Sequence, residues 1–298
     1  MIRHYLEEMF EPTLLYGLSL AVFGVAMASH YGAVSLAYGS LAIMGSVLAQ
    51  ISANVISDYF DYSSGLDREL GAGKKDNLSG GSSLMAKGLI KPVPTLFLGL
   101  AIFAAAAAIG IHLLLARPQI IPILIIAAFS ILLYSKYAKR IPYLSEPLCT
   151  LNYTLISLGV FIVASSTFSL PYGLAFALIP AGILLGGDAL FVNEVPDAGI
   201  DRKYGVRHSA VMLGTGRRIG LYYLSFQVAA YAIVVAGSLS GFIPMLSLIT
   251  LLTLPTTIYV YNGLRRRNAK KYGEYLFVHT LSAVVFAVLL SASFLVQW

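Results

Sequence analysis

Charged residues are scarce in this chain of 298 residues, because only 11% are Asp, Glu, Lys or Arg while 58% are hydrophobic. A soluble domain carries about 25% charged residues. The chain lacks the polar side chains that would cover a water-facing surface. This shortage excludes a soluble globular protein and indicates an integral membrane protein.

Cysteine is almost absent as well. The single Cys149 excludes an intramolecular disulfide and a cysteine-based metal site. The long apolar stretches also lack the alternation of polar and apolar residues that the strands of a membrane barrel show over about ten residues. Helices are therefore predicted, since they satisfy their backbone hydrogen bonds within the segment.

What the chain has in abundance is long apolar stretches, each roughly long enough to cross a hydrocarbon core of ~30 Å. We predict an all-α, polytopic membrane protein in which nine transmembrane helices surround a central cavity. Residues 1–298 form a single domain in this prediction. The expected spans lie near 13–29, 33–57, 93–116, 119–135, 145–166, 171–194, 219–238, 242–262 and 275–297.

Basic residues are distributed unevenly between the two sides of this topology. With nine crossings, 19 of the 20 Lys and Arg residues fall on the side of the N-terminus, and Arg117 alone lies opposite. The positive-inside rule then places the N-terminus and all four long loops at the cytoplasmic face of the cell membrane, and Trp298 outside. The net charge of +6 is explained by this rim, which attracts anionic headgroups and substrates. We expect membrane lipid as a partner, no nucleic acid and no obligatory protein partner.

Two acidic stretches share one pattern, an Asn followed four residues later by an Asp, and each lies where an apolar span meets a basic loop. Residues four apart share a face of a helix, so their oxygens point the same way. Pro196 is expected to kink or end the helix inside the second stretch. The candidate ligands are Asn54, Asp58, Asp61 and Asp67 in the first stretch, and Asn193, Glu194, Asp197 and Asp201 in the second.

Crowded carboxylates repel one another and resist desolvation, so they require cations or donors nearby. An all-oxygen ligand set with no His or Cys inside either stretch favours Mg²⁺. We expect the acids Asp58, Asp61, Asp197 and Asp201 to be catalytic. The predicted metal ligands are these four together with Asn54 and Asn193.

Lys and Arg residues that follow these acids indicate a diphosphate site, because Mg²⁺ typically joins carboxylates to substrate phosphates. A diphosphate whose body lies in the membrane is most simply a polyprenyl diphosphate. Metal and cations would neutralise the leaving group, and aromatic faces would stabilise the allylic cation. The predicted substrate-binding residues are Asn54, Asp67, Arg68, Tyr134, Lys139, Arg140, Tyr153, Asn193 and Lys203.

The Gly- and Ser-rich segment 71–83 is predicted to cover the headgroup site as a lid that excludes water. We also expect a gap between two helices that opens sideways to lipid, since a closed ring would trap a long apolar tail.

The paired motifs, the nine spans and the same-sided loops resemble the UbiA superfamily of intramembrane prenyltransferases over nearly the whole chain. Gln50 with the motif from Asn54 to Asp67, the stretch 80–92 and the motif from Asn193 to Asp201 look most like its MenA branch. The resemblance implies Mg²⁺-dependent transfer of a polyprenyl group to a small aromatic acceptor. That branch prenylates 1,4-dihydroxy-2-naphthoate for menaquinone biosynthesis.

Alternatives remain open at this point. The acceptor can instead be homogentisate, 4-hydroxybenzoate or a glycerol-phosphate ether lipid. A secondary transporter with an acidic coupling site is the rival from another class, although its acids would lie near the membrane midplane. Asp188, within a span, has either a structural or a catalytic role, and Asn152 either binds the acceptor or bridges helices.

Overall fold

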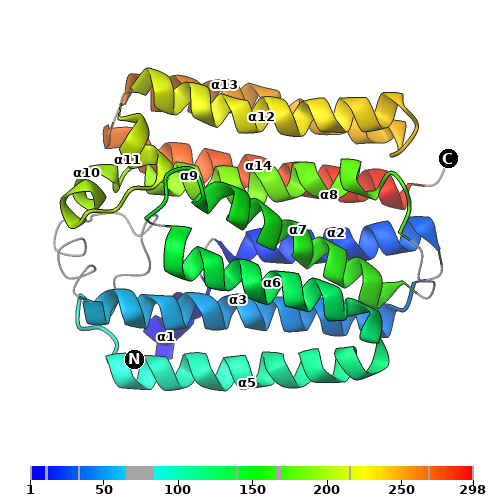
Figure 1. Ribbon diagram of the computed structural model, residues 1–298, viewed down its shortest axis with the longest axis horizontal. Helices are drawn as coiled ribbons and strands as arrows, with labels where there is room; N and C mark the ends of the chain where they lie inside the picture. Colours follow the sequence, from blue (N-terminus) through cyan, green and yellow to red (C-terminus); the bar gives the residue numbers. More distant parts are fainter. Residues whose placement is uncertain are drawn as a thin grey trace.

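The computed structural model describes residues 2–10, 13–32, 34–64, 84–138, 140–165, 170–214, 216–267 and 269–296. Apart from one isolated bridge between Val34 and Ser165, the secondary structure of this part is helical. The long α-helices run side by side along the long axis, and the short α1, α10 and α11 do not follow it (Figure 1). The α-helices are α1 (Ile2–Met9), α2 (Leu14–Tyr31), α3 (Leu36–Ser64), α5 (Pro92–Ala116), α6 (Ile121–Leu133), α7 (Ser145–Ala164), α8 (Leu174–Gly182), α9 (Ala189–Glu194), α10 (Ala198–Asp201), α11 (Ser209–Leu213), α12 (Gly216–Leu239), α13 (Leu254–Arg266) and α14 (Tyr272–Leu295).

Eight helical segments in the described part of the chain are long and apolar enough to cross a membrane. They coincide with eight of the nine predicted spans. The remaining span, 119–135, is helical but shorter: a 310 turn at Pro118–Ile120 leads into the 13-residue α6. It ends in a π-helical turn at Tyr134–Ala138. A ninth crossing therefore stays a prediction, as does the cytoplasmic N-terminus.

Helix α3 is longer than predicted. The sequence predicts a span that ends near residue 57, whereas the helix continues to Ser64. The prediction followed hydropathy, and the last two turns are polar. Because the helix continues through these turns, Asn54 and Asp58 share one face of α3, as the spacing indicated. Residues 65–83, which include the predicted lid, lie outside the described residues.

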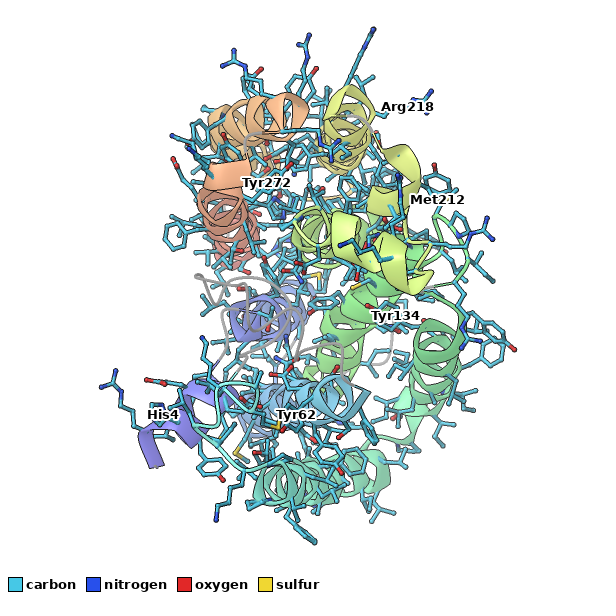
Figure 2. All side chains as sticks on the ribbon, turned by 90° about the vertical axis from the view of Figure 1, so that its left-hand side faces the viewer. His4, Tyr62, Tyr134, Met212, Arg218 and Tyr272 are labelled. Atoms are coloured by element: carbon cyan, nitrogen blue, oxygen red, sulfur yellow. The ribbon has the colours of Figure 1, made fainter. Side chains whose placement is uncertain are left out.

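The helices pack in a definite order. Helix α5 lies along α3, α2 packs against both α7 and α14, and α12 pairs with α13. Viewed end-on, α12 and α13 lie at one extreme of the molecule and α3 with α5 at the other (Figure 2). A central core joins α2 to α14 through the fully buried Phe23, Phe286 and Leu290.

Small residues bring the second acidic stretch close to α7. Two glycines lie in the π-helical segment Ile183–Asp188, which joins α8 to α9. A Cβ on Gly186 would lie 2.8 Å from the backbone oxygen of Cys149, and one on Gly187 would lie 2.4 Å from Oγ1 of Thr150. Such close backbone approach is how membrane helices pack tightly. It sets the position of α9, which carries the second motif.

Candidate active site

One cavity of about 1020 Å³ receives residues of both acidic motifs. Asn54 and Asp58 reach it from α3. Asn193, Asp197 and Asp201 reach it from α9, α10 and the turn between them. Residues 139 positions apart in the sequence therefore line the same space.

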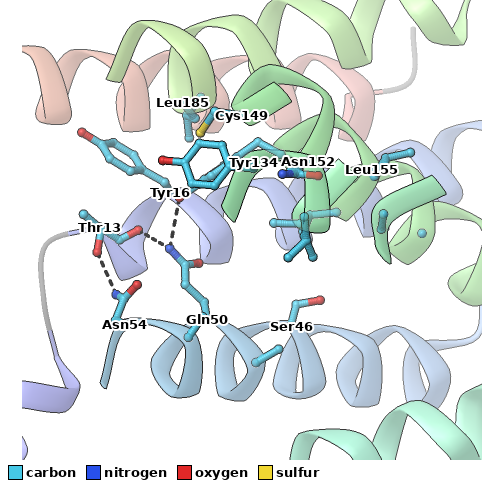
Figure 3. Close-up of a pocket in the computed structure, with 18 of the residues that line it drawn as sticks. Thr13, Tyr16, Ser46, Gln50, Asn54, Tyr134, Cys149, Asn152, Leu155 and Leu185 are labelled. Atoms are coloured by element: carbon cyan, nitrogen blue, oxygen red, sulfur yellow. Dashed lines mark hydrogen bonds between the residues drawn. The ribbon is translucent and has the colours of Figure 1, made fainter. Parts of the chain in front are cut away.

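The first motif is held in place by Thr13, which lies just before α2 (Figure 3). The Asn54 amide donates from Nδ2 to Oγ1 of Thr13 at 3.0 Å. The Gln50 amide, one turn earlier on α3, donates from Nε2 to the Thr13 carbonyl at 2.7 Å and to the Tyr153 hydroxyl at 3.4 Å. Because Nδ2 of Asn54 is used in this way, its carbonyl oxygen is the atom left to bind a cation.

The second motif lies where the helix is interrupted, as Pro196 predicted. Helix α9 ends at Glu194, residues 195–197 form a turn, and α10 begins at Ala198. The backbone N–H of Asp201 donates to the carbonyl of Asp197 at 3.0 Å. One helical turn thus places Asp197 and Asp201 together at the wall of the cavity.

His208 is a site residue that the sequence interpretation missed. Its Nε2 lies 2.8 Å from Oδ2 of Asp201, and its Nδ1 lies 3.4 Å from Oε2 of Glu194. The side chain is 3% exposed, yet it lines the cavity. His208 is seven residues beyond Asp201 in a basic loop. The chain must turn at Gly205, where φ is +74°, to bring it back.

Two predicted aromatic residues, Tyr134 and Tyr153, line the same cavity. Two predicted cations do not: Arg140 and Lys203 are exposed and lie outside the cavity lining. Asp67, Arg68 and Lys139 lie outside the described residues, as does the side chain of Asp61. Their roles remain predictions.

The oxygen donors suit a cation such as Mg²⁺ that completes its coordination with substrate and water. Asn54, Asp58, Asn193, Asp197 and Asp201 supply only oxygens and carry three negative charges. Within the described ranges, no three His, Cys, Asp or Glu residues are grouped closely enough to hold a metal by themselves. This donor set therefore fits a metal bound jointly with an anionic ligand.

Away from the acids the cavity becomes apolar and opens sideways. Helix α5 packs along α3 and α6 along α7, and no comparable packing joins α5 to α6 in the described part of the chain. Ile111 on α5, with Leu124 and Ile131 on α6, line the cavity and are about half exposed. The cavity is therefore open between α5 and α6, as we expected of one helix pair.

The model of the UbiA prenyltransferase family matches residues 18–283, which is most of the chain. The chain belongs to the UbiA prenyltransferase family. It is accordingly a prenyltransferase and an integral membrane protein, and the resemblance seen in the sequence is confirmed.

Individual relatives of this UbiA family member are distant. The 1,4-dihydroxy-2-naphthoate octaprenyltransferase of Bacillus subtilis (strain 168) is 25% identical over 264 residues, covering 87% of this chain and 79% of that protein. A UbiA homolog from Aeropyrum pernix K1 superposes with a TM-score of 0.67 at 16% identity, covering 94% of this chain and 96% of that chain. A UbiA homolog from Archaeoglobus fulgidus bound to GPP and Mg²⁺ superposes with a TM-score of 0.56 at 15% identity, covering 98% of this chain and 99% of that chain. These structures share the fold.

Asp188 lies apart from the cavity of this UbiA family member. It is fully buried and is not among the residues that line the cavity. Nε2 of Gln227 donates to its Oδ2 at 2.5 Å, and Oγ1 of Thr257 donates to Oε1 of Gln227 at 2.7 Å. His279 approaches the same carboxylate at 3.9 Å. These contacts favour the structural interpretation of Asp188. Asn152, in contrast, lines the cavity.

Proposed function

We propose that this enzyme transfers a polyprenyl group from a polyprenyl diphosphate to a small aromatic acceptor, 1,4-dihydroxy-2-naphthoate, in a Mg²⁺-dependent reaction. The observation that carries the proposal is the cavity itself, which joins an oxygen-rich end to an apolar end that opens between α5 and α6. A prenyl diphosphate likewise has a charged headgroup at one end and a long apolar tail at the other.

The two acidic motifs would hold the headgroup. When bound, Mg²⁺ neutralises negative charge on the diphosphate as the allylic C–O bond breaks. Asn54 and Asp58 would bind the metal from one wall, with Asn193, Asp197 and Asp201 binding it from the other. Asp61, whose side chain lies outside the described part of the structure, is proposed as a further ligand from the last turns of α3.

Cations would bind the diphosphate from the rim of the cavity. Arg140 and Lys203 are long and exposed, so their side chains are free to turn toward a bound headgroup. Arg68, Lys139 and Asp67 belong to the same proposal by their place in the sequence. A charge-assisted contact of this kind contributes about 1.5–3 kcal/mol.

The aromatic rings of Tyr134 and Tyr153 would face the allylic cation from the cavity wall. Electron-rich ring faces attract a cation within about 6 Å of the ring centroid. The orientation of Tyr153 is supported by the hydrogen bond from Gln50 to its hydroxyl. Substrate would enter from lipid between α5 and α6, with the acidic end at the cytoplasmic face of the cell membrane.

The choice of acceptor rests on the naphthoate octaprenyltransferase of Bacillus subtilis and on the form of the first motif. The deciding experiment is an assay of the purified protein with geranylgeranyl diphosphate and Mg²⁺. The acceptors are 1,4-dihydroxy-2-naphthoate, homogentisate, 4-hydroxybenzoate and a glycerol-phosphate ether lipid. Transfer to the naphthoate at the highest kcat/KM supports the proposal, and preference for another acceptor replaces it.

A further inference from the structure

His208 makes a set of contacts that joins three separate elements around the acidic end of the cavity. Its imidazole lies beside Asp201 at the end of α10 and beside Glu194 at the end of α9. It is also the residue that precedes α11, and its Nδ1 accepts a hydrogen bond from the backbone N–H of Val211 at 3.4 Å.

The cap on α11 fits one tautomer of the His208 ring. A backbone N–H is a donor only, so Nδ1 accepts and the proton of the neutral ring is on Nε2. In this tautomer Nε2 donates to Oδ2 of Asp201, at 2.8 Å, and Oε2 of Glu194 lies 3.4 Å from Nδ1. The ring nitrogens thus have separate tasks: Nδ1 caps a helix, and Nε2 orients a carboxylate.

Burial of both side chains strengthens the hydrogen bond between His208 and Asp201. The side chains of His208 and Asp201 are 3% and 13% exposed, so little water competes for the bond between them. Hydrogen bonds to an ionised acceptor are roughly twice as strong as neutral ones. Because His208 engages Oδ2, the carboxylate is held in one rotamer while Asp201 lines the cavity.

We infer that His208 is a positioning residue that orients Asp201 for binding the metal and diphosphate, an inference that rests on the proposed function. Carboxylates that bind metals are commonly held by such outer hydrogen bonds, and removing one typically weakens metal binding by about 10–100-fold. In this role His208 acts through Asp201.

Two substitutions separate the tasks of the ring. His208→Asn keeps an acceptor near the position of Nδ1, and Asn is among the preferred N-cap residues, but its amide is too short to reach Asp201. His208→Gln keeps a donor about as far from the backbone as Nε2 and loses the cap. If His208 served only to cap α11, His208→Asn would have a smaller effect than His208→Gln in every assay.

The test measures thermal stabilisation of the full-length protein in detergent by Mg²⁺ with inorganic diphosphate, alongside its unfolding temperature without ligands. We expect His208→Asn to keep the parental unfolding temperature and to need at least about tenfold more Mg²⁺ for half-maximal stabilisation. His208→Gln should show the reverse, a lower unfolding temperature and a near-parental Mg²⁺ midpoint.

An unchanged Mg²⁺ midpoint in His208→Asn, with the parent responding normally, would overturn the positioning role and leave the proposed function intact. A parent that Mg²⁺ and diphosphate do not stabilise would overturn the metal assignment and the role of His208 together. The prenyl-transfer assay of the parent, run separately, decides whether the proposed function also fails.

Discussion

The side-chain oxygen of Gln50 on α3 lies directly over the Cα of Gly17 on α2. A Cβ built on Gly17 would be 1.8 Å from Oε1 of Gln50. No side chain fits at position 17 while Gln50 keeps its bonds to Thr13 and Tyr153. The two helices therefore meet at a glycine so that a polar wall of the cavity can form.

We expect Gly17→Ala to displace the Gln50 side chain and break both of its hydrogen bonds. The free energy of unfolding should fall by about 1–2 kcal/mol, and activity should fall further because Thr13 and Tyr153 lose their support. Thermal unfolding in detergent and the transfer rate measure the two effects. Gly110→Ala is the stability control, since a Cβ at Gly110 meets nothing within 4 Å. Equal unfolding temperatures for both variants would contradict this reading of Gly17.

Removal of divalent metal should abolish transfer, because the donors at the acidic end are oxygens that require a cation to bind diphosphate. Excess EDTA should stop the reaction and added Mg²⁺ should restore it. Asp58→Ala and Asp197→Ala should each be inactive while unfolding cooperatively in detergent. Full activity in excess EDTA would rule out the metal assignment.

Neutralising Arg140 and Lys203 tests whether these cations bind substrate. Arg140→Gln or Lys203→Gln should weaken prenyl-diphosphate binding by about 1.5–3 kcal/mol, with a smaller effect on the KM for the acceptor. Lys270→Gln is the matched control, because Lys270 is exposed on the loop between α13 and α14. If all three variants bind the diphosphate equally well, Arg140 and Lys203 serve only to orient the protein in the membrane.

Gln227→Leu should destabilise the protein, because it leaves the buried carboxylate of Asp188 without its donor. We expect a loss of about 1–3 kcal/mol. Asp188→Asn retains an oxygen that can accept from Gln227 and should cost less. Unfolding in detergent ranks the two variants, and assays below the unfolding temperature should show transfer by both. A folded but inactive Asp188→Asn protein would return Asp188 to the list of catalytic candidates.

A large side chain at Gly110, which lines the cavity beside the exposed Ile111, should narrow the opening between α5 and α6. We expect Gly110→Phe to raise the KM for geranylgeranyl diphosphate more than that for the shorter dimethylallyl diphosphate. Comparing kcat/KM for the two donors measures the effect. An unchanged ratio would mean that the tail does not pass this point.

Much of this molecule was predictable from local sequence. Eight spans follow from apolar length, the shared face of Asn54 and Asp58 follows from helical spacing, and the break after α9 follows from Pro196. Each of these properties depends on residues within a turn or two of one another. The family also follows, because its motifs are short and contiguous.

Tertiary structure alone decided the rest. The bond from His208 to Asp201, the contact of Gln50 with Gly17 and the opening between α5 and α6 join residues whose proximity depends on how helices pack and how a turn at Gly205 directs the chain. In a membrane, lipid tails and apolar side chains are alike, so hydropathy shows that a helix is inserted but not which neighbours it takes. That choice is made by close packing at small residues and by hydrogen bonds between helices, which only the assembled bundle contains.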